Sequence, residues 1–164
     1  MKKLVMVFAA GLLFSSVAKA QVADDLCVAT FADGKTFYAK VLSTSGKIVN
    51  TKMLHTGSLY SFKDDTVTAS KGAYKVGHTC KKIVFYGTRK KDLGYVGDFI
   101  EVTFGDGVPF FATIESNMND GVETRMLHSG NKYKFNADGV VLESTGVYPV
   151  GHKTQSILVL TRRK

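Results

Sequence analysis

The sequence ATFADGKTFYAKVLSTSGKIVNTKMLHTGSLYSF at residues 29–62 occurs a second time, as VTFGDGVPFFATIESNMNDGVETRMLHSGNKYKF at residues 102–135. The two stretches align without a gap, and fifteen of the 34 aligned positions are identical. One inserted residue later, the pattern Gly-x-Tyr-x-Val-Gly-His at 72–78 recurs at 146–152. The chain therefore carries an internal repeat of about 73 residues, and such a repeat predicts one structural unit per copy.

Apolar and polar side chains alternate along each copy with a period of two. Residues 37–41, Phe-Tyr-Ala-Lys-Val, alternate in this way, and residues 110–114 are their counterparts. The alternation predicts half-buried strands. The Asp-Gly pairs at 33–34 and 106–107 are typical of hairpin turns, because glycine accepts a positive φ. We therefore predict an all-β fold of two tandem small antiparallel barrels, each with five or six short strands.

The first twenty residues have the features of a secretory signal peptide. Two lysines precede an apolar stretch at residues 4–17, and Ala18-Lys19-Ala20 is an A-x-A cleavage site. We expect a bacterial Sec-type signal peptide, so that the mature protein is periplasmic or secreted. The chain is predicted to divide into the signal peptide at 1–20, a first barrel at 21–86, a glycine- and charge-rich connector at 87–97, and a second barrel with a basic tail at 98–164.

The mature chain is moderately basic. The full chain has a formal net charge of +8 at pH 7, and removal of Lys2, Lys3 and Lys19 with the signal peptide leaves +5. Such a charge suits anionic partners, although it also serves solubility alone. The exported location favours an anionic glycan, a lipid head group or a protein surface over nucleic acid. No transmembrane segment is expected after signal cleavage.

The chain has two cysteines, Cys27 and Cys80. Exported proteins commonly oxidise such a pair, so we expect a structural disulfide that joins the start of the first repeat to its end. Closing so long a loop would stabilise the fold by roughly 3–4 kcal/mol. The second repeat has Ile100 and Thr154 at the matching positions, so it would fold without an equivalent bond.

Two aromatic residues at matching positions, Tyr38 and Phe111, are the strongest candidates for a binding site. If Phe37 and Phe110 face inward, the period of two places Tyr38 and Phe111 on the outer face. Aromatic faces with interleaved cations stack on sugars or bases and neutralise anionic groups, which would make a ligand platform. The cations expected beside the rings are Lys40, Lys52, Arg125, Lys132 and Lys134. The alternative is that both rings pack against the other unit or against a loop.

The pattern F-x-D-G-x-x-F-x-A-x-V at residues 31–41 resembles the first hairpin of Tudor and related SH3-like barrels. The resemblance covers about 35 residues of each repeat and implies an SH3-like order of strands and turns. Tudor domains commonly hold methylated side chains in an aromatic cage, which would draw here on Phe31 and Tyr38. The turn position that often carries a cage tyrosine is Thr56 or Ser129, so a complete cage is not expected.

A second pattern, Ser/Thr-Gly-x-x-Tyr followed about ten residues later by Lys-Gly, resembles a segment of membrane-bound or periplasmic inhibitors of c-type lysozyme. It occurs at residues 56–60 with Lys71-Gly72, and in part at residues 129–133. In that family a serine-containing loop and a lysine reach the carboxylates of the lysozyme cleft. The resemblance implies these roles for Thr56, Lys71 and Ser129, and lysozyme inhibition as the alternative function.

The remaining polar residues do not form a catalytic or metal-binding pattern. The histidines fall into two matching pairs, His55 with His128 and His78 with His152, and two ligands per repeat are too few for zinc. The aspartates precede or lie in turns, where aspartate bonds its own backbone. No nucleophile, base and orienting group occur in a suitable arrangement. The sequence thus predicts an exported, non-enzymatic binding protein with no cofactor and no metal.

Overall fold

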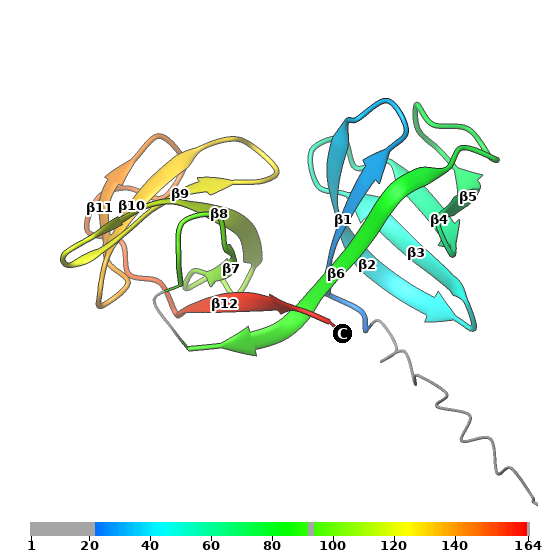
Figure 1. The fold of residues 1–164 in the computed structure, drawn as a ribbon. Helices are drawn as coiled ribbons and strands as arrows, with labels where there is room; N and C mark the ends of the chain where they lie inside the picture. The colour runs from blue at the N-terminus through cyan, green and yellow to red at the C-terminus, as the bar shows by residue number, and fades with distance from the viewer. Residues whose placement is uncertain (1–21, 92–93, 164) are drawn as a thin grey trace, which may run out of the picture.

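The computed structural model describes residues 22–91 and 94–163, so the predicted signal peptide lies outside the described residues. The described residues form twelve strands and no helix, and thus no helix that could cross a membrane (Figure 1). The strands are β1 (Leu26–Phe31), β2 (Thr36–Ser45), β3 (Ile48–Met53), β4 (Leu59–Lys63), β5 (Thr66–Ser70), β6 (Cys80–Lys90), β7 (Phe99–Thr103), β8 (Pro109–Met118), β9 (Gly121–Met126), β10 (Lys132–Asn136), β11 (Val141–Ser144) and β12 (Ser156–Arg162). The all-β prediction is confirmed.

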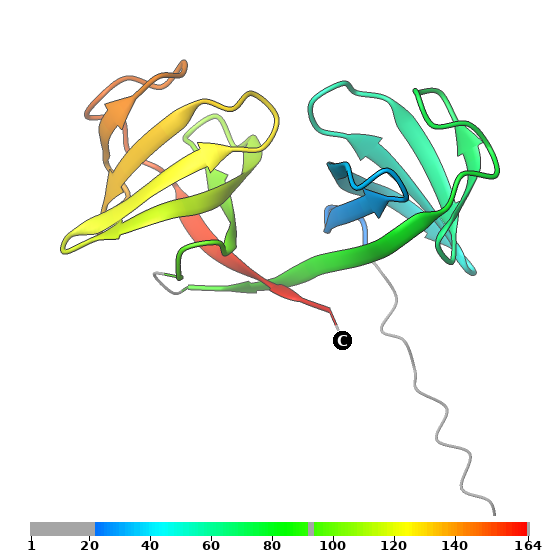
Figure 2. The ribbon, with the colours of Figure 1, turned by 45° about the horizontal axis from the view of Figure 1, so that its top comes forward.

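The twelve strands pair into one antiparallel sheet in the order β11-β10-β9-β8-β7-β12-β6-β1-β2-β3-β4-β5. The sheet does not close on itself, and the prediction of two tandem small barrels is not confirmed. Figures 1 and 2 show two strongly curled parts joined by the long strands β6 and β12. We call residues 22–91 the first half and residues 94–163 the second half.

Each half encloses its own apolar core, built from the inward side chains of its strands. Phe31 is fully buried in the first half and Phe104 in the second. The ring of Tyr74 stacks on Phe31 with centroids 3.7 Å apart, and Tyr148 stacks on Phe104 at 3.6 Å. Matching positions of the two copies therefore make matching core contacts.

A glycine after the fifth strand of each half makes room for a buried tyrosine. A Cβ atom added to Gly72 would lie 2.1 Å from the hydroxyl of Tyr60, and one added to Gly146 would lie 2.0 Å from that of Tyr133. The hydroxyl of Tyr60 also accepts the backbone N–H of Tyr74 at 3.3 Å. Glycine is required at these positions by close approach.

The halves are joined by a seam between β6 and β12. The first part of β6 pairs with β1, and its end pairs with β12, where Thr88 lies opposite Thr161 and Lys90 lies opposite Val159. Residues 87–90, expected to begin the connector, are therefore strand residues. The glycine- and charge-rich composition of residues 87–90 does not predict a strand. The strand forms because these residues pair with β12 in the other half.

An apolar cluster fills the space between the halves above the seam. Leu26, Phe111 and Leu160 are its buried members, and Tyr38 and Phe99 pack against them. Tyr38 and Phe99 meet edge to face with centroids 5.7 Å apart. The side chain of Phe111 is only 4% exposed. Phe111 is therefore not part of an open aromatic platform, whereas Tyr38 is only partly covered.

Two ion pairs cross the seam. The guanidinium of Arg89 donates to both carboxylate oxygens of Glu101, at 2.9 and 2.6 Å. The guanidinium of Arg163 donates to both oxygens of Asp25, one of them at 3.0 Å, and the Asp25 side chain is only 1% exposed. A Cβ atom added to Gly87 would lie 2.2 Å from an oxygen of Asp25, so this glycine provides the space. The predicted basic tail is in part a structural element.

The two cysteines are free thiols in the core of the first half. In the β1–β6 register Cys80 lies opposite Phe31, four residues from Cys27. Burial raises the pKa of Cys27 to about 12 and that of Cys80 to about 11. Both thiols belong to the same core cluster, and the disulfide between them stays a prediction.

Candidate binding surface

Three lysines lie in one line across the outer face of the first half. Lys40 on β2 is opposite Lys52 on β3, and Lys52 is opposite Leu59 on β4. The N–H of Lys71 donates to the carbonyl of Leu59 at 2.8 Å, so Lys71 continues the same row just after β5. Register partners share a face of the sheet. With neighbouring strands about 4.8 Å apart, this lysine row (Lys40, Lys52 and Lys71) is roughly 14 Å long.

Most of the positive charge of the lysine row is not neutralised by an ion pair within the described residues. Lys40 pairs with Asp24 at 2.6 Å. Lys52 and Lys71 are exposed and have no ion pair within the described residues. Lys40 and Lys52 were predicted for the ligand platform, and Lys71 was predicted for the lysozyme-inhibitor alternative. All three lie in this row.

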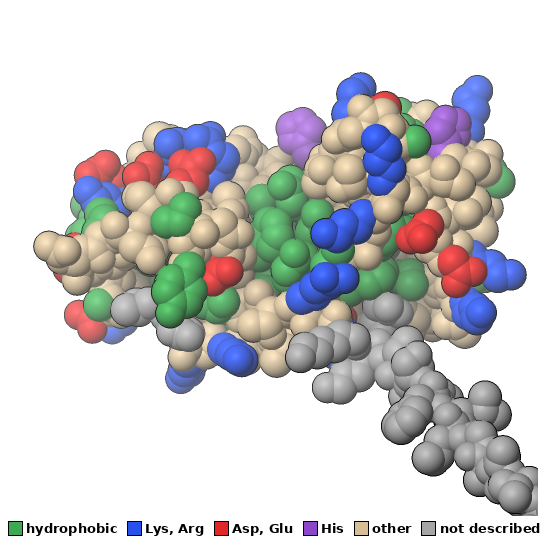
Figure 3. Space-filling view, in the orientation of Figure 1, with side chains coloured by type: hydrophobic (Ala, Val, Ile, Leu, Met, Phe, Trp, Pro, Cys, Tyr) green, Lys and Arg blue, Asp and Glu red, His purple; other side chains and the backbone are tan. Residues whose placement is uncertain are grey.

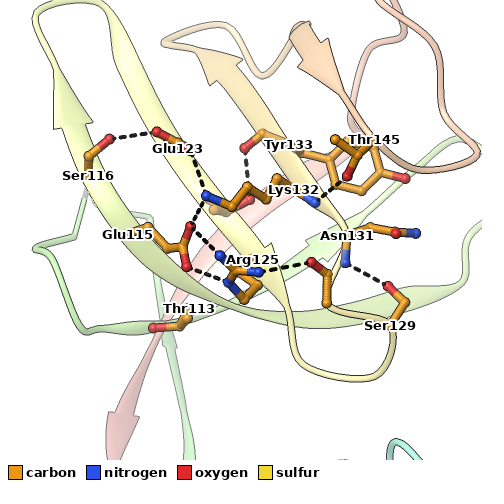
Figure 4. Close-up of polar contacts among 12 residues, drawn as sticks. Thr113, Glu115, Ser116, Glu123, Arg125, Ser129, Asn131, Lys132, Tyr133 and Thr145 are labelled. Carbon is orange, nitrogen blue, oxygen red and sulfur yellow. Dashed lines mark hydrogen bonds and ion pairs between the residues drawn. The ribbon is translucent and has the colours of Figure 1, made fainter.

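The matching row of the second half is neutralised by its own carboxylates (Figure 4). Arg125 and Lys132 both bind Glu115, and the Lys132 ammonium lies 2.9 Å from its carboxylate oxygen. Hydrogen bonds from Arg125, then Lys132, lower the pKa of Glu115, and the bond to Glu115 raises the pKa of Lys132. Lys134 likewise pairs with Glu143 at 3.0 Å. These three predicted cations are therefore poor candidates for anion binding.

One residue accounts for much of the difference between the two rows. Both β2 and β8 contain an irregularity in register, at Leu42 in the first half and at Glu115 in the second. Glu115 uses this position to reach Arg125 and Lys132, whereas the Leu42 side chain has no charge and is 44% exposed. The first row consequently lacks the carboxylate that neutralises the second.

The charge of the whole molecule is divided in the same way. The first half has twelve Lys and Arg against five Asp and Glu, a formal charge of +7, and the second half has six against eight, a charge of −2. Among the described residues of the first half, nine exposed lysines form no ion pair: Lys47, Lys52, Lys63, Lys71, Lys75, Lys81, Lys82, Lys90 and Lys91. Figure 3 shows basic side chains spread over the half that contains β1–β5.

The turns at Thr56-Gly57 and Ser129-Gly130, which carry the resemblance to lysozyme inhibitors, lie next to each other where the halves face each other. Nδ1 of His55 lies 3.0 Å from the carbonyl oxygen of His128, and these histidines directly precede Thr56 and Ser129. The Thr56 hydroxyl accepts the N–H of Ser58 at 3.2 Å, and the Ser129 hydroxyl accepts that of Asn131 at 3.2 Å. Both hydroxyls thus shape their own turns.

The paired aspartates and tyrosines at the other turns are structural. Asp33 accepts the N–H of Lys35 and the hydroxyl of Tyr74, and Asp106 makes the matching bond with Tyr148. Burial, then the bond to aspartate, raises the pKa of each tyrosine to about 12. The tyrosine bond lowers the pKa of each aspartate. Within residues 22–91 and 94–163, no group of three or more His, Cys, Asp or Glu side chains is placed to hold a metal ion.

Comparison with known proteins adds no relative: no family model, no curated protein and no solved structure matches the chain. The candidate surface therefore rests on its own geometry. The signal that sequence reasoning missed is the difference between Leu42 and Glu115, which the aligned repeats display directly.

Proposed function

We propose that the protein is an exported, non-enzymatic binding protein that holds an anionic partner on the lysine row of its first half. The observation that carries the proposal is the contrast between the two rows, one neutralised by Glu115 and the other left charged. A linear acidic glycan is the best fit, because the three lysines lie in a line across the strands. A lipid head group and an acidic protein surface are the other partners that the charge allows.

The sequence resemblance to SH3-like barrels leads to a further proposal about the shape of each half. A single bridge between Thr66 and Thr79 brings the edge of β5 back to the segment before β6, and Val140 and Lys153 form the matching bridge. We infer that each half is a partly open small barrel. Loops and outer strands of such barrels are common binding surfaces.

Neutralising the lysine row should weaken binding to heparin, used as a linear acidic glycan. We expect Lys52→Gln and Lys71→Gln each to lower the affinity about fivefold, since each basic residue contributes on the order of 1 kcal/mol near an anionic surface. Leu42→Glu should have a similar effect, because it supplies the carboxylate that the second half already has. Titration calorimetry at low and high salt measures these affinities, and binding should weaken as salt increases.

Lys134→Gln is the matched control, because Lys134 is already paired with Glu143. Its heparin affinity should equal that of the unaltered protein. Equal losses in Lys134→Gln and Lys52→Gln would contradict a specific row and leave only general charge attraction. Parallel titrations with phosphatidylglycerol vesicles distinguish a lipid partner from a glycan.

Lysozyme inhibition is the second candidate function, favoured by the contact that brings the turns of Thr56 and Ser129 together. It predicts that micromolar protein inhibits a c-type lysozyme and that Lys71→Ala and Ser129→Ala each weaken inhibition at least tenfold. Full lysozyme activity in the presence of the protein would end this hypothesis. Because Ser129 lies outside the lysine row, Ser129→Ala should leave heparin binding unchanged, which separates the two functions.

A further inference from the structure

The second half contains a cavity of about 510 Å³ on the side away from the two facing turns. Its wall comes from the start of β9, the β10–β11 turn and the segment that leads into β12, with Lys91 at the rim. A volume of this size lies within the range of small-molecule sites, roughly 300–1,000 Å³. It is separate from the lysine row, which lies on the other half.

Two glycines of the second half contribute to the lining of this cavity. Gly121 and Gly139 line it, whereas the matching positions of the first half hold the larger Ile48 and Asp65. A Cβ atom added to Gly121 would lie 1.8 Å from the carbonyl oxygen of Phe135. The backbone of β9 can approach that of β10 so closely only with glycine at this position.

The lining includes ammonium, amide and hydroxyl groups that can bind a polar ligand. Lys91 and Lys153 supply ammonium groups, and neither forms an ion pair within the described part of the chain. The side-chain oxygen of Asn136 accepts the N–H groups of Asp138 and Val140, at 3.1 and 2.8 Å, which leaves its amide nitrogen as a donor. Gln155 and Ser156 add further polar groups.

Two features argue against a bare inorganic anion as the ligand. Val122 and Ile157 give the cavity an aliphatic wall, which an inorganic anion does not need. Asp138 adds a carboxylate, which accepts hydrogen bonds from hydroxyl groups such as those of a sugar. The lining therefore fits a molecule with one carboxylate, several hydroxyls and a carbon ring face.

We propose that this cavity binds an acidic sugar residue, with Lys153 and Lys91 facing its carboxylate. The amides of Asn136 and Gln155 and the carboxylate of Asp138 bond the sugar hydroxyls, and Val122 and Ile157 pack against the ring. Ammonium groups attract carboxylates through charge-assisted hydrogen bonds. The proposal does not depend on the lysine row, so either site can fail while the other stands.

The test compares methyl β-D-glucuronide with methyl β-D-glucoside, two sugars that differ at the carboxylate. Amide chemical shifts are followed by NMR during titration of the mature protein. We expect the glucuronide to shift the signals of Gly139, Thr154 and Gln155 with millimolar affinity, and the glucoside to bind at least fivefold more weakly. Lys153→Gln should remove that preference, and Gln155→Ala should weaken both sugars.

Lys134→Gln serves as the control, because it changes a paired lysine outside the cavity and should leave the titration unchanged. Sodium phosphate is titrated as a separate probe. Equal affinity for phosphate and glucuronide would overturn the proposal in favour of a simple anion site. Equal affinity for the two sugars, or no shift at tens of millimolar glucuronide, would also overturn it.

Discussion

Phe111→Ala should lower the free energy of unfolding by about 3–5 kcal/mol, the usual effect of truncating a buried phenylalanine. The ring is nearly inaccessible to solvent and packs with Leu26 and Leu160 between the halves. The truncation would leave a cavity at the contact that holds the halves together. Urea unfolding followed by circular dichroism measures the change.

Tyr38→Ala is the matched comparison, because Tyr38 occupies the same position in the first half but is only partly buried. Its loss of stability should be clearly smaller. If Phe111→Ala kept full stability and instead weakened ligand binding, the aromatic platform would be restored and the packing role rejected.

Asp25→Ala should lower the free energy of unfolding by about 3 kcal/mol, because removing one partner of a buried ion pair leaves the other charge uncompensated. The value lies at the low end of the usual range, since the Arg163 side chain is 19% exposed and can reach water. The substitution also removes the acceptor of the Val22 N–H at 3.1 Å. Urea unfolding at neutral pH gives the change.

Asp98→Ala provides the control for this result. Asp98 accepts the N–H of Tyr95 at 2.9 Å, as Asp25 accepts that of Val22, but no arginine among residues 22–91 and 94–163 pairs with it. A double-mutant cycle with Arg163→Ala isolates the interaction between Asp25 and Arg163. Equal losses for Asp25→Ala and Asp98→Ala, with no coupling in the cycle, would show that the ion pair adds nothing.

The local part of this fold could be read from the sequence. The alternation at residues 37–41 predicted a strand, and these residues lie in β2. The Asp-Gly pairs predicted turns, and Gly34 and Gly107 have φ values of 85° and 76°. Both features depend on residues that are close together in the sequence, so short sequence patterns are enough to predict them.

The contacts between the halves could not be read in the same way. The period of two correctly placed Phe110 and Phe111 on opposite faces, since they join different apolar clusters. It could not show that the second face is covered, because the covering residues come from distant strands. Likewise, the sequence predicts that Arg89 is part of a charged linker, whereas in the structure it pairs with Glu101.

The candidate site was predicted in pieces. Lys40 and Lys52 were expected to bind together, whereas Lys71 entered through a different resemblance. Only the register of β2, β3 and β4, with the bond from the Lys71 N–H to the Leu59 carbonyl, places all three in one row. The predicted cations of the second half are weaker candidates, because carboxylates on nearby strands pair with them.

The seam also sets an order of events during synthesis. Asp25 and Arg163 are 138 residues apart in the chain, and the end of β6 pairs with residues that follow Leu158. A chain made from its amino terminus can form the core of the first half early. Until the second half is present, however, the Asp25 carboxylate lacks Arg163 and the end of β6 lacks its partner strand. Contacts of such long range form slowly. Residues at the end of the second half thus complete the first half.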